Sequence, residues 1–442
     1  MLKKVTLLIA VLIVTANISF AQWANQGAWP KNPPAGALYA TGQNHAMAVD
    51  PDGKVWVGRY SNVATTLFTN PATGKPLRTA CYLTYIFNPD GTEASFSPIF
   101  QVMGDTMYNT SQRGMRVNSD GNILLVVGAT SPNGPMMYKI NYKTGVGMKK
   151  VMLAPATAGA STAPCVSSNG TIFVGPVTGG QYPLSMYDQN FTLIGTAIEK
   201  TTSFSRSFEV SKDGNTIYYA GYTNGKVHVF TRADEFSSFA LKDSIMDGAA
   251  CESFTWHPVN KNQLWMSAGS KNDPPKGKFT IGSWYAYDVV QKKIVDSLKW
   301  KFVTPATPED SRPRALAFSP DGKIAYIGSF GNGTADLIQK VVLGGSDVKK
   351  IDELPSGYDL SQNYPNPFNP TTTIKFSVPV EGMVSLRVYN MLGQEVETLL
   401  DSYKGAGTYQ VTFDASKLSS GVYTYTLNTE KTSISKKMLL VK

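Results

Sequence analysis

The stretch ALAFSPDGKIAYIG, Ala315–Gly328, alternates apolar residues, turns through Ser-Pro-Asp-Gly and then continues into a second apolar segment. Such alternation is typical of a half-buried strand, and a glycine in a short turn supplies the positive φ that a tight hairpin needs. The stretch therefore predicts two antiparallel strands joined by a turn that ends at Gly322.

Five further segments repeat this pattern. They are AMAVDPDGKVWVG (46–58), GMRVNSDGNILLVVG (114–128), APCVSSNGTIFVG (163–175), SFEVSKDGNTIYYAG (207–221) and the looser SFTWHPVNKNQLWMSAG (253–269). Repeats spaced by roughly 45–70 residues indicate an array of similar units, either the blades of a propeller or the turns of a solenoid.

A second, outer hairpin is expected after each inner one. The outer segments are 80–99, 137–153, 184–198, 226–236, 283–298 and the shorter 337–345. Because four strands per repeat make one propeller blade, we expect an all-β, six-bladed β-propeller over residues 22–345, or seven blades if the gap after Gly58 contains another. Residues 23–39 are expected to add the last outer strand of the final blade and so close the ring.

The inner hairpins resemble those of YVTN-type and WD-repeat-like propellers. In the best copy, Phe318 precedes the Ser-Pro-Asp-Gly turn, and Tyr326 and Gly328 follow it. The resemblance covers the middle of the chain. It implies a fold and no particular activity.

After Gly345 the composition changes. Residues 346–359 are polar and are predicted to be a linker. Residues 360–442 carry a proline-rich entry followed by strand signals at 372–378, 384–389, 408–413, 422–427 and 435–441. Short strands separated by turns predict a small, Ig-like β-sandwich.

This tail closely resembles the C-terminal sorting domain of type IX secretion cargo. The resemblance rests on NYPNPFNPTTTIKFSVP (363–379), VSLRVYNMLGQEV (384–396), GTYQVTFDASKLSSGVYTYTL (407–427) and the terminal SKKMLLVK (435–442). It implies a protein that crosses the outer membrane of a Gram-negative bacterium with the type IX machinery as its partner. Such proteins are released or attached at the cell surface.

The N-terminus predicts a targeting segment. Lys3 and Lys4 precede an apolar run, and Ser19–Ala21 form a small-residue cleavage site, so residues 1–21 are expected to be a secretory signal peptide. The apolar run is too short to span a bilayer. We expect no transmembrane segment in the mature protein.

The net charge and the cysteine content limit the binding partners and the disulfides that the sequence allows. The net charge of +9 is spread without a basic run, which argues against nucleic-acid binding. The three cysteines, Cys81, Cys165 and Cys251, are too few and too scattered for a disulfide framework, and the last two are expected to be buried thiols. The histidines His228 and His257 are expected to be structural or exposed.

No catalytic motif, metal-ligand spacing or phosphate loop occurs in the sequence, and we expect no cofactor and no metal. One positional pattern does point to a site. Aligning the inner strands on the last apolar residue before each turn puts small residues three positions earlier: Ala46, Gly114, Ala163, Ser207, Ser253 and Ala315. Small residues fit the crowded propeller axis.

Polar residues stand one position further back, at His45, Arg113, Thr162, Arg206, Glu252 and Arg314. They begin the innermost strands, so they are expected to ring one mouth of the channel. Three arginines suit a carboxylate, phosphate or sulfate. The candidate ligand-binding residues are His45, Arg113, Arg206, Glu252 and Arg314. The alternative is a structural polar collar.

Two function classes stay open. The first is a non-enzymatic module that binds a glycan, another polymer or a protein, with an anionic ligand or glycan as the possible partner of the ring. The second is a secreted propeller enzyme that acts at the channel mouth: a metal-free lyase, a lactonase or a quinoprotein-like enzyme. The ring is basic and offers only Glu252 and His45 as acid–base groups, which disfavours a divalent-metal lactonase and favours binding.

Overall fold

The structure is a computed structural model of the 442-residue chain. It describes residues 23–33, 44–59, 67–69, 76–78, 83–106, 111–128, 135–153, 161–177, 183–200, 205–221, 224–271, 273–302, 312–330, 338–343, 349–352 and 355–442. The predicted signal peptide and Cys81 lie outside these residues. The chain divides into one compact unit over 22–345 and another that contains 346–442. No α-helix occurs among the described residues.

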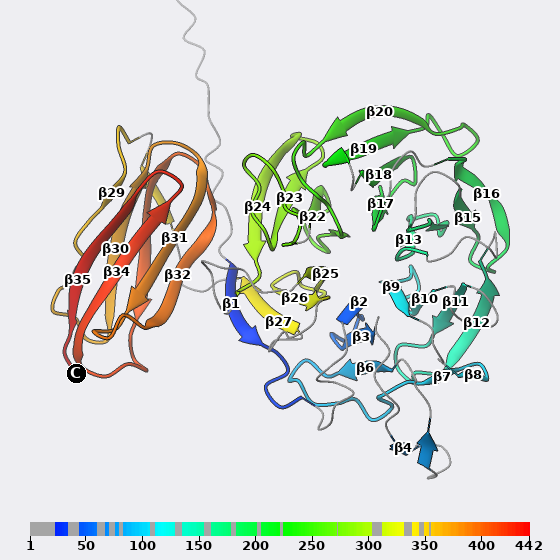
Figure 1. The fold of residues 1–442 in the computed structure, drawn as a ribbon, viewed down its shortest axis with the longest axis horizontal. Coiled ribbons are helices and arrows are strands. Elements are labelled where there is room, and N and C mark those ends of the chain that lie inside the picture. Colours follow the sequence, from blue (N-terminus) through cyan, green and yellow to red (C-terminus); the bar gives the residue numbers. More distant parts are fainter. Residues whose placement is uncertain are drawn as a thin grey trace, which may run out of the picture. The chain divides into compact units, whose positions relative to one another are not determined.

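The first unit is a β-propeller, as predicted. Six of its described sheets stand around a common axis and form the blades (Figure 1). In order along the ring, the first blade has β2 (Asn44–Val49), β3 (Val55–Arg59) and β6 (Thr84–Phe87), and the second has β9 (Gln112–Val117), β10 (Ile123–Val127), β11 (Met136–Ile140) and β12 (Gly147–Met152). The third blade has β13 (Cys165–Val166), β14 (Ile172–Val174), β15 (Leu184–Tyr187) and β16 (Leu193–Ile198), and the fourth has β17 (Phe208–Val210), β18 (Thr216–Gly221), β19 (Lys226–Thr231) and β20 (Ala240–Ile245). The fifth blade has β21 (Phe254–Trp256), β22 (Gln263–Ser267), β23 (Ser283–Asp288) and β24 (Lys293–Lys299), and the sixth has β25 (Pro313–Phe318), β26 (Ile324–Ser329), β27 (Ile338–Leu343) and β1 (Trp23–Ala28).

The N-terminal strand β1 closes the ring, as the sequence predicted. It pairs antiparallel with β27, with Trp23 opposite Leu343. Trp23 also donates its indole N–H to Asp296 of the preceding blade, at 2.9 Å, and packs against Trp265 and Phe318. Because both ends of the unit contribute to one blade, separating the first and last blades would require breaking this sheet.

The turn of the first inner hairpin forms because a polar side chain at its first position bonds to the backbone further along. The Asp50 carboxylate accepts from the amides of Asp52 and Lys54, at 3.0 and 2.9 Å. Gly53 then takes φ +82°, a left-handed conformation that disfavours a side chain. These turns fix where each inner strand ends, and hence the height of its residues along the channel.

Apolar side chains on the two faces of each blade pack against neighbouring blades. One buried cluster joins the first and last blades through Met47, Val57, Ala315 and Tyr326. The small residues nearest the axis are needed for this packing, because a Cβ on Gly114 would lie 2.1 Å from the Cα of Ala163 in the next blade. The crowding expected at the propeller axis is therefore confirmed.

The outer part of the first blade departs from the prediction. We expected a complete hairpin over 80–99, but β6 is its one strand among the described residues, and the return segment makes isolated bridges. The Ile86 amide donates to the Ser97 hydroxyl, and Pro98 has no N–H to donate. The return segment therefore cannot form a regular ladder of backbone hydrogen bonds with β6. Two small hairpins, β4–β5 (Leu67–Thr69 and Pro76–Arg78) and β7–β8 (Gln101–Val102 and Asp105–Thr106), were not predicted.

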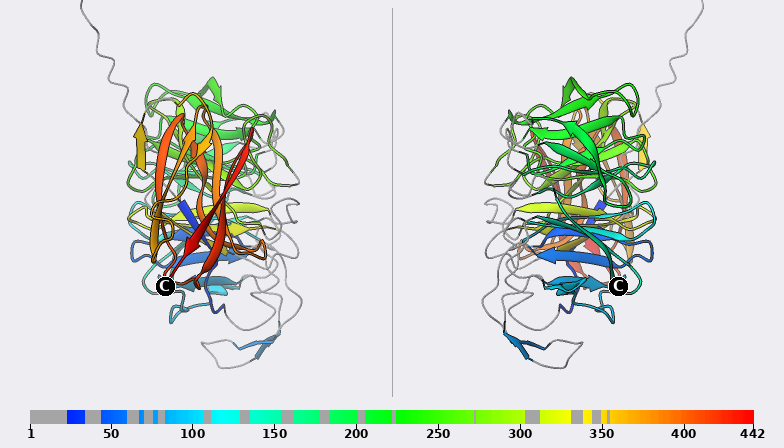
Figure 2. Two further views of the ribbon diagram at one scale, coloured as in Figure 1. Left: turned by 90° about the vertical axis from the view of Figure 1, so that its left-hand side faces the viewer. Right: turned by 90° about the vertical axis from the view of Figure 1, so that its right-hand side faces the viewer.

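The β4–β5 hairpin projects from the body of the propeller (Figures 1 and 2). In the fourth blade the outermost strand is β20, at 240–245, whereas the sequence placed the outer hairpin within 226–236. A loop separates β19 from β20 and exposes 91% of the Phe236 side chain. That aromatic residue suggested a strand although it lies in the loop.

The second unit is a β-sandwich of two four-stranded sheets, as predicted. One sheet has the order β28 (Lys349–Asp352), β33 (Gly407–Asp414), β30 (Thr371–Val378) and β29 (Asp359–Leu360); the other has β32 (Glu395–Lys404), β31 (Gly382–Tyr389), β34 (Gly421–Thr429) and β35 (Ser433–Leu440). Alternate residues of the long strands form one buried core that includes Phe376, Leu386, Tyr409 and Tyr425.

Two features of the sandwich correct the prediction. Residues 346–359, expected to be a linker, contain strand β28, which pairs antiparallel with β33. Strand β32 was not predicted, because it carries a bulge at Leu399, opposite Leu386 and Arg387 of β31, which interrupts the regular alternation and buries the consecutive residues Leu399 and Leu400. Among the described residues, no helix is long and apolar enough to cross a membrane.

Candidate ligand site in the propeller channel

The five candidate residues lie around one small cavity at the propeller axis, here called the ring cavity. His45 and Arg113 belong to β2 and β9, Arg314 to β25, and Arg206 and Glu252 directly precede β17 and β21. The cavity has a volume of about 40 Å³. Each residue comes from a different blade, and the common turn register brings all five to the same height.

The sixth polar residue of the alignment, Thr162, has a different role. Its hydroxyl donates to the carbonyl of Gly175 at 3.1 Å, a bond within its own blade. It is not among the residues that line the ring cavity.

Glu252 is the centre of the charged network in the ring cavity. Its side chain is fully buried, and its carboxylate lies 2.8 Å from Nε of Arg314 and 3.5 Å from Nε of Arg206. Burial raises the pKa of Glu252, whereas the two arginines act in the opposite direction. Arg314 is itself 3% exposed, and its guanidinium stacks 4.3 Å from the ring centroid of Phe330. Three adjacent blades are thus joined through one carboxylate.

His45 is held neutral in this cavity. Burial lowers its pKa well below the usual value, and the positive charges of Arg314, Arg113 and Arg206 lower it further. The Nδ1 atom lies 3.1 Å from the Arg113 carbonyl, which can only accept, so Nδ1 carries the proton. The imidazole of His45 therefore adds no positive charge to the ring cavity.

Positive charge exceeds negative charge among the residues that line the ring cavity. Arg113, Arg206 and Arg314 carry three positive charges, Glu252 carries one negative charge, and the remaining arginine, Arg116, is ion-paired. The excess is two. A volume of about 40 Å³ holds roughly three water molecules, which is the size of a single oxyanion group rather than of a sugar ring.

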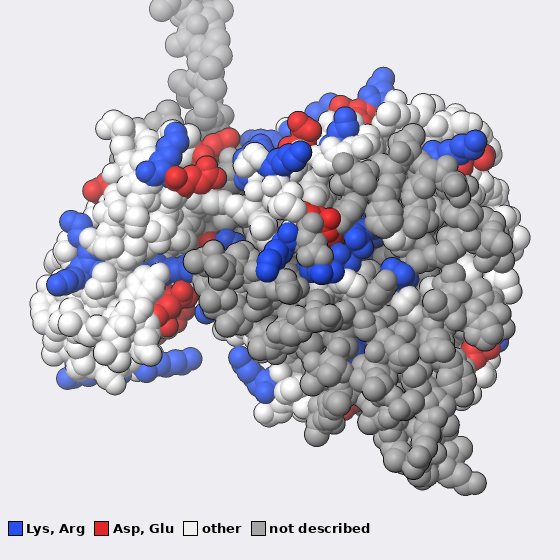
Figure 3. Space-filling model, viewed as in Figure 1, with Lys and Arg blue, Asp and Glu red and all other residues white. Residues whose placement is uncertain are grey.

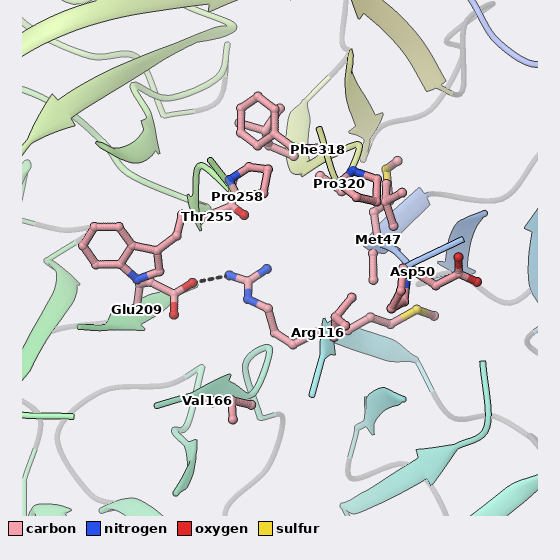
Figure 4. A pocket seen from close by; sticks show the side chains of 17 residues that line it. Met47, Asp50, Arg116, Val166, Glu209, Thr255, Pro258, Phe318 and Pro320 are labelled. Atoms are coloured by element: carbon pink, nitrogen blue, oxygen red, sulfur yellow. Dashed lines mark hydrogen bonds and ion pairs between the residues drawn. The ribbon is translucent and has the colours of Figure 1, made fainter. Parts of the chain in front are cut away.

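A second, larger cavity was not predicted from the sequence. It lies toward the turns of the inner hairpins, has a volume of about 430 Å³ and is called the turn-side cavity below (Figure 4). Its charged centre is an ion pair between Arg116 of β9 and Glu209 of β17, at 2.8 Å. A sequence signal for this cavity does exist in the alignment of the six inner strands. At the position directly before the last apolar residue, two strands carry a charged residue, Arg116 and Glu209, and these have opposite signs.

The other singled-out residues have structural surroundings. His257 accepts the Asn260 amide at its Nδ1, at 2.9 Å, and its Nε2 lies 3.2 Å from the Gly322 carbonyl, so it ties two turns together. Cys165 and Cys251 are buried free thiols, as predicted. Burial raises the pKa of both thiols, so that neither is ionised at neutral pH.

Among the described residues, no group of three or more His, Cys, Asp or Glu side chains is arranged to hold a metal ion. On the face shown in Figure 3, Lys and Arg side chains are scattered among Asp and Glu over the described elements. The dispersed surface charge expected from the sequence is seen there, in contrast to the concentrated charge of the ring cavity.

Comparison with known proteins identifies the C-terminal unit. Residues 362–442 match the family model described as the secretion system C-terminal sorting domain. Together with the fold, this match defines an exported all-β protein that carries a β-propeller and a type IX sorting domain. It is secreted, and is attached to the cell surface or released.

Two further comparisons concern the chain as a whole. No curated protein matches the sequence. The similar solved structures include that of a luciferin-regenerating enzyme, with a TM-score of 0.45 and 11% sequence identity; the similarity covers 73% of this chain and 95% of that chain.

Proposed function

We propose that this protein is an exported binding protein whose propeller holds the anionic group of a ligand in the ring cavity. The ligand class is a carboxylated or sulfated molecule, such as a fragment of an acidic glycan. One observation carries the proposal: three arginines besides the ion-paired Arg116, and a single carboxylate, line a cavity the size of one oxyanion.

The electrostatics of the ring cavity support this proposal. A guanidinium donates to a carboxylate or sulfate through two parallel hydrogen bonds, and such charge-assisted bonds contribute about 1.5–3 kcal/mol each. Two of the arginines, Arg113 and Arg206, are half-buried, so a ligand can reach them without displacing the sealed pair of Arg314 and Glu252. Neutral His45 adds no further positive charge to the repulsion among the arginines.

The test is calorimetry with the mature protein at low salt. Oligogalacturonate is compared with a neutral galactose oligomer of equal length, and sulfate is added as a competitor. We expect the acidic oligomer to bind, the neutral one to bind much more weakly, and rising salt to weaken binding because exposed charge interactions are screened.

Variants locate the binding site. Arg113→Gln combined with Arg206→Gln removes two ring charges and keeps the pair of Arg314 and Glu252, so affinity should fall by about tenfold or more. Lys323→Gln removes one exposed charge from an inner turn and serves as the matched control. A preference for the neutral oligomer, or affinity unchanged by the double substitution, would identify the ring as a structural collar that joins the blades.

A further inference from the structure

The turn-side cavity has the size and walls of a small-molecule pocket. Its volume of about 430 Å³ lies within the range of about 300–1,000 Å³ that such sites occupy. The apolar part of the wall comes from five of the six blades and includes Met47, Val117, Val166, Leu316 and Phe318. Side chains from opposite blades point toward one another across this space (Figure 4).

Three prolines, Pro51, Pro258 and Pro320, stand where the inner turns meet the cavity. Each has a fixed φ, and each follows the end of an inner strand that is paired in a sheet. The rim is therefore rigid before any ligand arrives, which reduces the entropy lost on binding.

The guanidinium of Arg116 offers a ligand a hydrogen-bonding position in this cavity. Nη2 of Arg116 donates both to the Glu209 carboxylate and to the Phe254 carbonyl. The other carboxylate oxygen of Glu209 accepts the Val210 amide, at 3.1 Å. Glu209 is thus satisfied within the protein, while the other end of the guanidinium points into the cavity (Figure 4).

The charges of the turn-side cavity do not favour an anion. Arg116 is already neutralised by Glu209, and the other charged residue on the wall is the buried carboxylate of Asp50, which Trp56 and two backbone amides hold. Trp256 uses its N–H to bond the Val210 carbonyl, so its remaining surface is an apolar aromatic face. A carboxylate ligand would have to compete with Glu209 in a site with no excess positive charge.

We propose that the turn-side cavity is a second binding site, for a neutral, largely apolar small molecule with one hydrogen-bond acceptor, such as an aromatic ketone or ester. The apolar body lies against the methionine, valine and tryptophan side chains, and the acceptor takes a bond from Arg116. This site is independent of the anion site in the ring cavity, although the two cavities share Met47, Met115, Arg116 and Leu316 in their walls.

The experiment uses 2-acetonaphthone and 2-naphthoate as a matched pair, because the two differ in whether the ring carries a neutral ketone or a carboxylate. Nile red, a neutral dye with one carbonyl acceptor, is the third probe. Binding to the mature protein is measured by calorimetry and by the fluorescence of the dye. We expect the ketone and the dye to bind saturably, the ketone more tightly than naphthoate, and neither to weaken with salt.

Two substitutions fill the cavity from different blades. Val166→Trp and Thr255→Phe each place a larger side chain on a half-buried position of the wall, and each should lower the affinity for the ketone by about tenfold or more. A denaturation midpoint close to that of the parent protein establishes that a variant is folded. Arg113→Gln with Arg206→Gln is the control, and it should leave the ketone affinity unchanged.

The proposal is overturned if neither the ketone nor the dye binds saturably, if naphthoate binds more tightly than the ketone, or if folded filling variants bind as the parent does. Loss of ketone binding in the Arg113 and Arg206 control would also overturn it, since the ligand would then lie in the ring cavity. Failure of the acidic glycan in the earlier test leaves these outcomes unaffected, so the two proposals can fail separately.

Discussion

Gly322 offers the sharpest test of the inner-hairpin turns. It ends the Ser-Pro-Asp-Gly turn with φ +70°, and a Cβ placed on it would lie 2.4 Å from Cε1 and 2.8 Å from Nε2 of His257 in the neighbouring blade. Gly53 ends the corresponding turn of the first blade with φ +82°, but its Cβ would meet a single atom, Cγ of Pro89, at 3.3 Å. The two positions share a backbone conformation and differ in crowding.

The expected costs follow from this difference. An alanine in the left-handed region costs about 1–2 kcal/mol, and Gly53→Ala should lose about that much stability. Gly322→Ala pays the same strain and must also displace His257, which bonds the Gly322 carbonyl and the Asn260 amide. Since a net hydrogen bond contributes about 0.5–1.5 kcal/mol, the total for Gly322→Ala should be about 2–4 kcal/mol.

Urea unfolding followed by tryptophan fluorescence measures these losses in the full chain. All seven tryptophans lie between residues 23 and 300, so the signal reports on the propeller and not on the sandwich. Replacing His257 with alanine in the Gly322→Ala protein should cost less than it does in the parent protein, because the clash has been removed. Equal losses at Gly53 and Gly322 would refute the role of His257, and no loss at either would refute the turn assignment.

Three further predictions concern pH, ring closure and export. Burial and the nearby arginines lower the pKa of His45 in the folded protein. As the pH falls below the usual pKa of 6.5, the unfolded chain therefore binds a proton at His45 and the folded protein does not, so the free energy of unfolding should fall between about pH 7 and pH 5. The fall should be less steep in His45→Gln. Trp23→Ala removes a 5%-exposed indole and its bond to Asp296 and should cost about 3–5 kcal/mol in urea unfolding, whereas Trp23→Phe should cost less. Deletion of 346–442, which includes β28, should leave a folded propeller in the periplasm, and undiminished protein in the medium or at the cell surface would contradict this.

The inner hairpins could be predicted from the sequence because two local signals coincide in them. Alternating apolar residues give a strand of period two, and a turn such as Asp50–Gly53 fixes where that strand ends. Once the ends are known, residues at equal distance from the turn lie at equal height along the channel. That is why His45, Arg113 and Glu252 could be grouped before the fold was known.

Other features depend on tertiary context and could not be predicted in this way. The 349–352 strand carries no apolar alternation, and it forms because β33 presents an edge for pairing. The first blade has no fourth strand among its described residues because Ser97 and Pro98 compete locally with regular pairing. The alignment placed Glu252 near three arginines, but only the folded ring shows that Arg314 takes the short contact and Arg206 the longer one.

The two cavities show why function in this propeller must be read across the repeats rather than along them. Six inner strands meet at the axis, so one aligned position contributes up to six side chains to one level of the channel. Four positions before the last apolar residue, that level holds three arginines, one glutamate and a neutral His45, with an excess of two positive charges. One position before it, the level holds Arg116 and Glu209, which neutralise each other among small or apolar residues. Three residues of sequence therefore separate a level suited to an anion from one suited to a neutral molecule, and a comparison of aligned positions detects both although neither forms a motif within a single repeat.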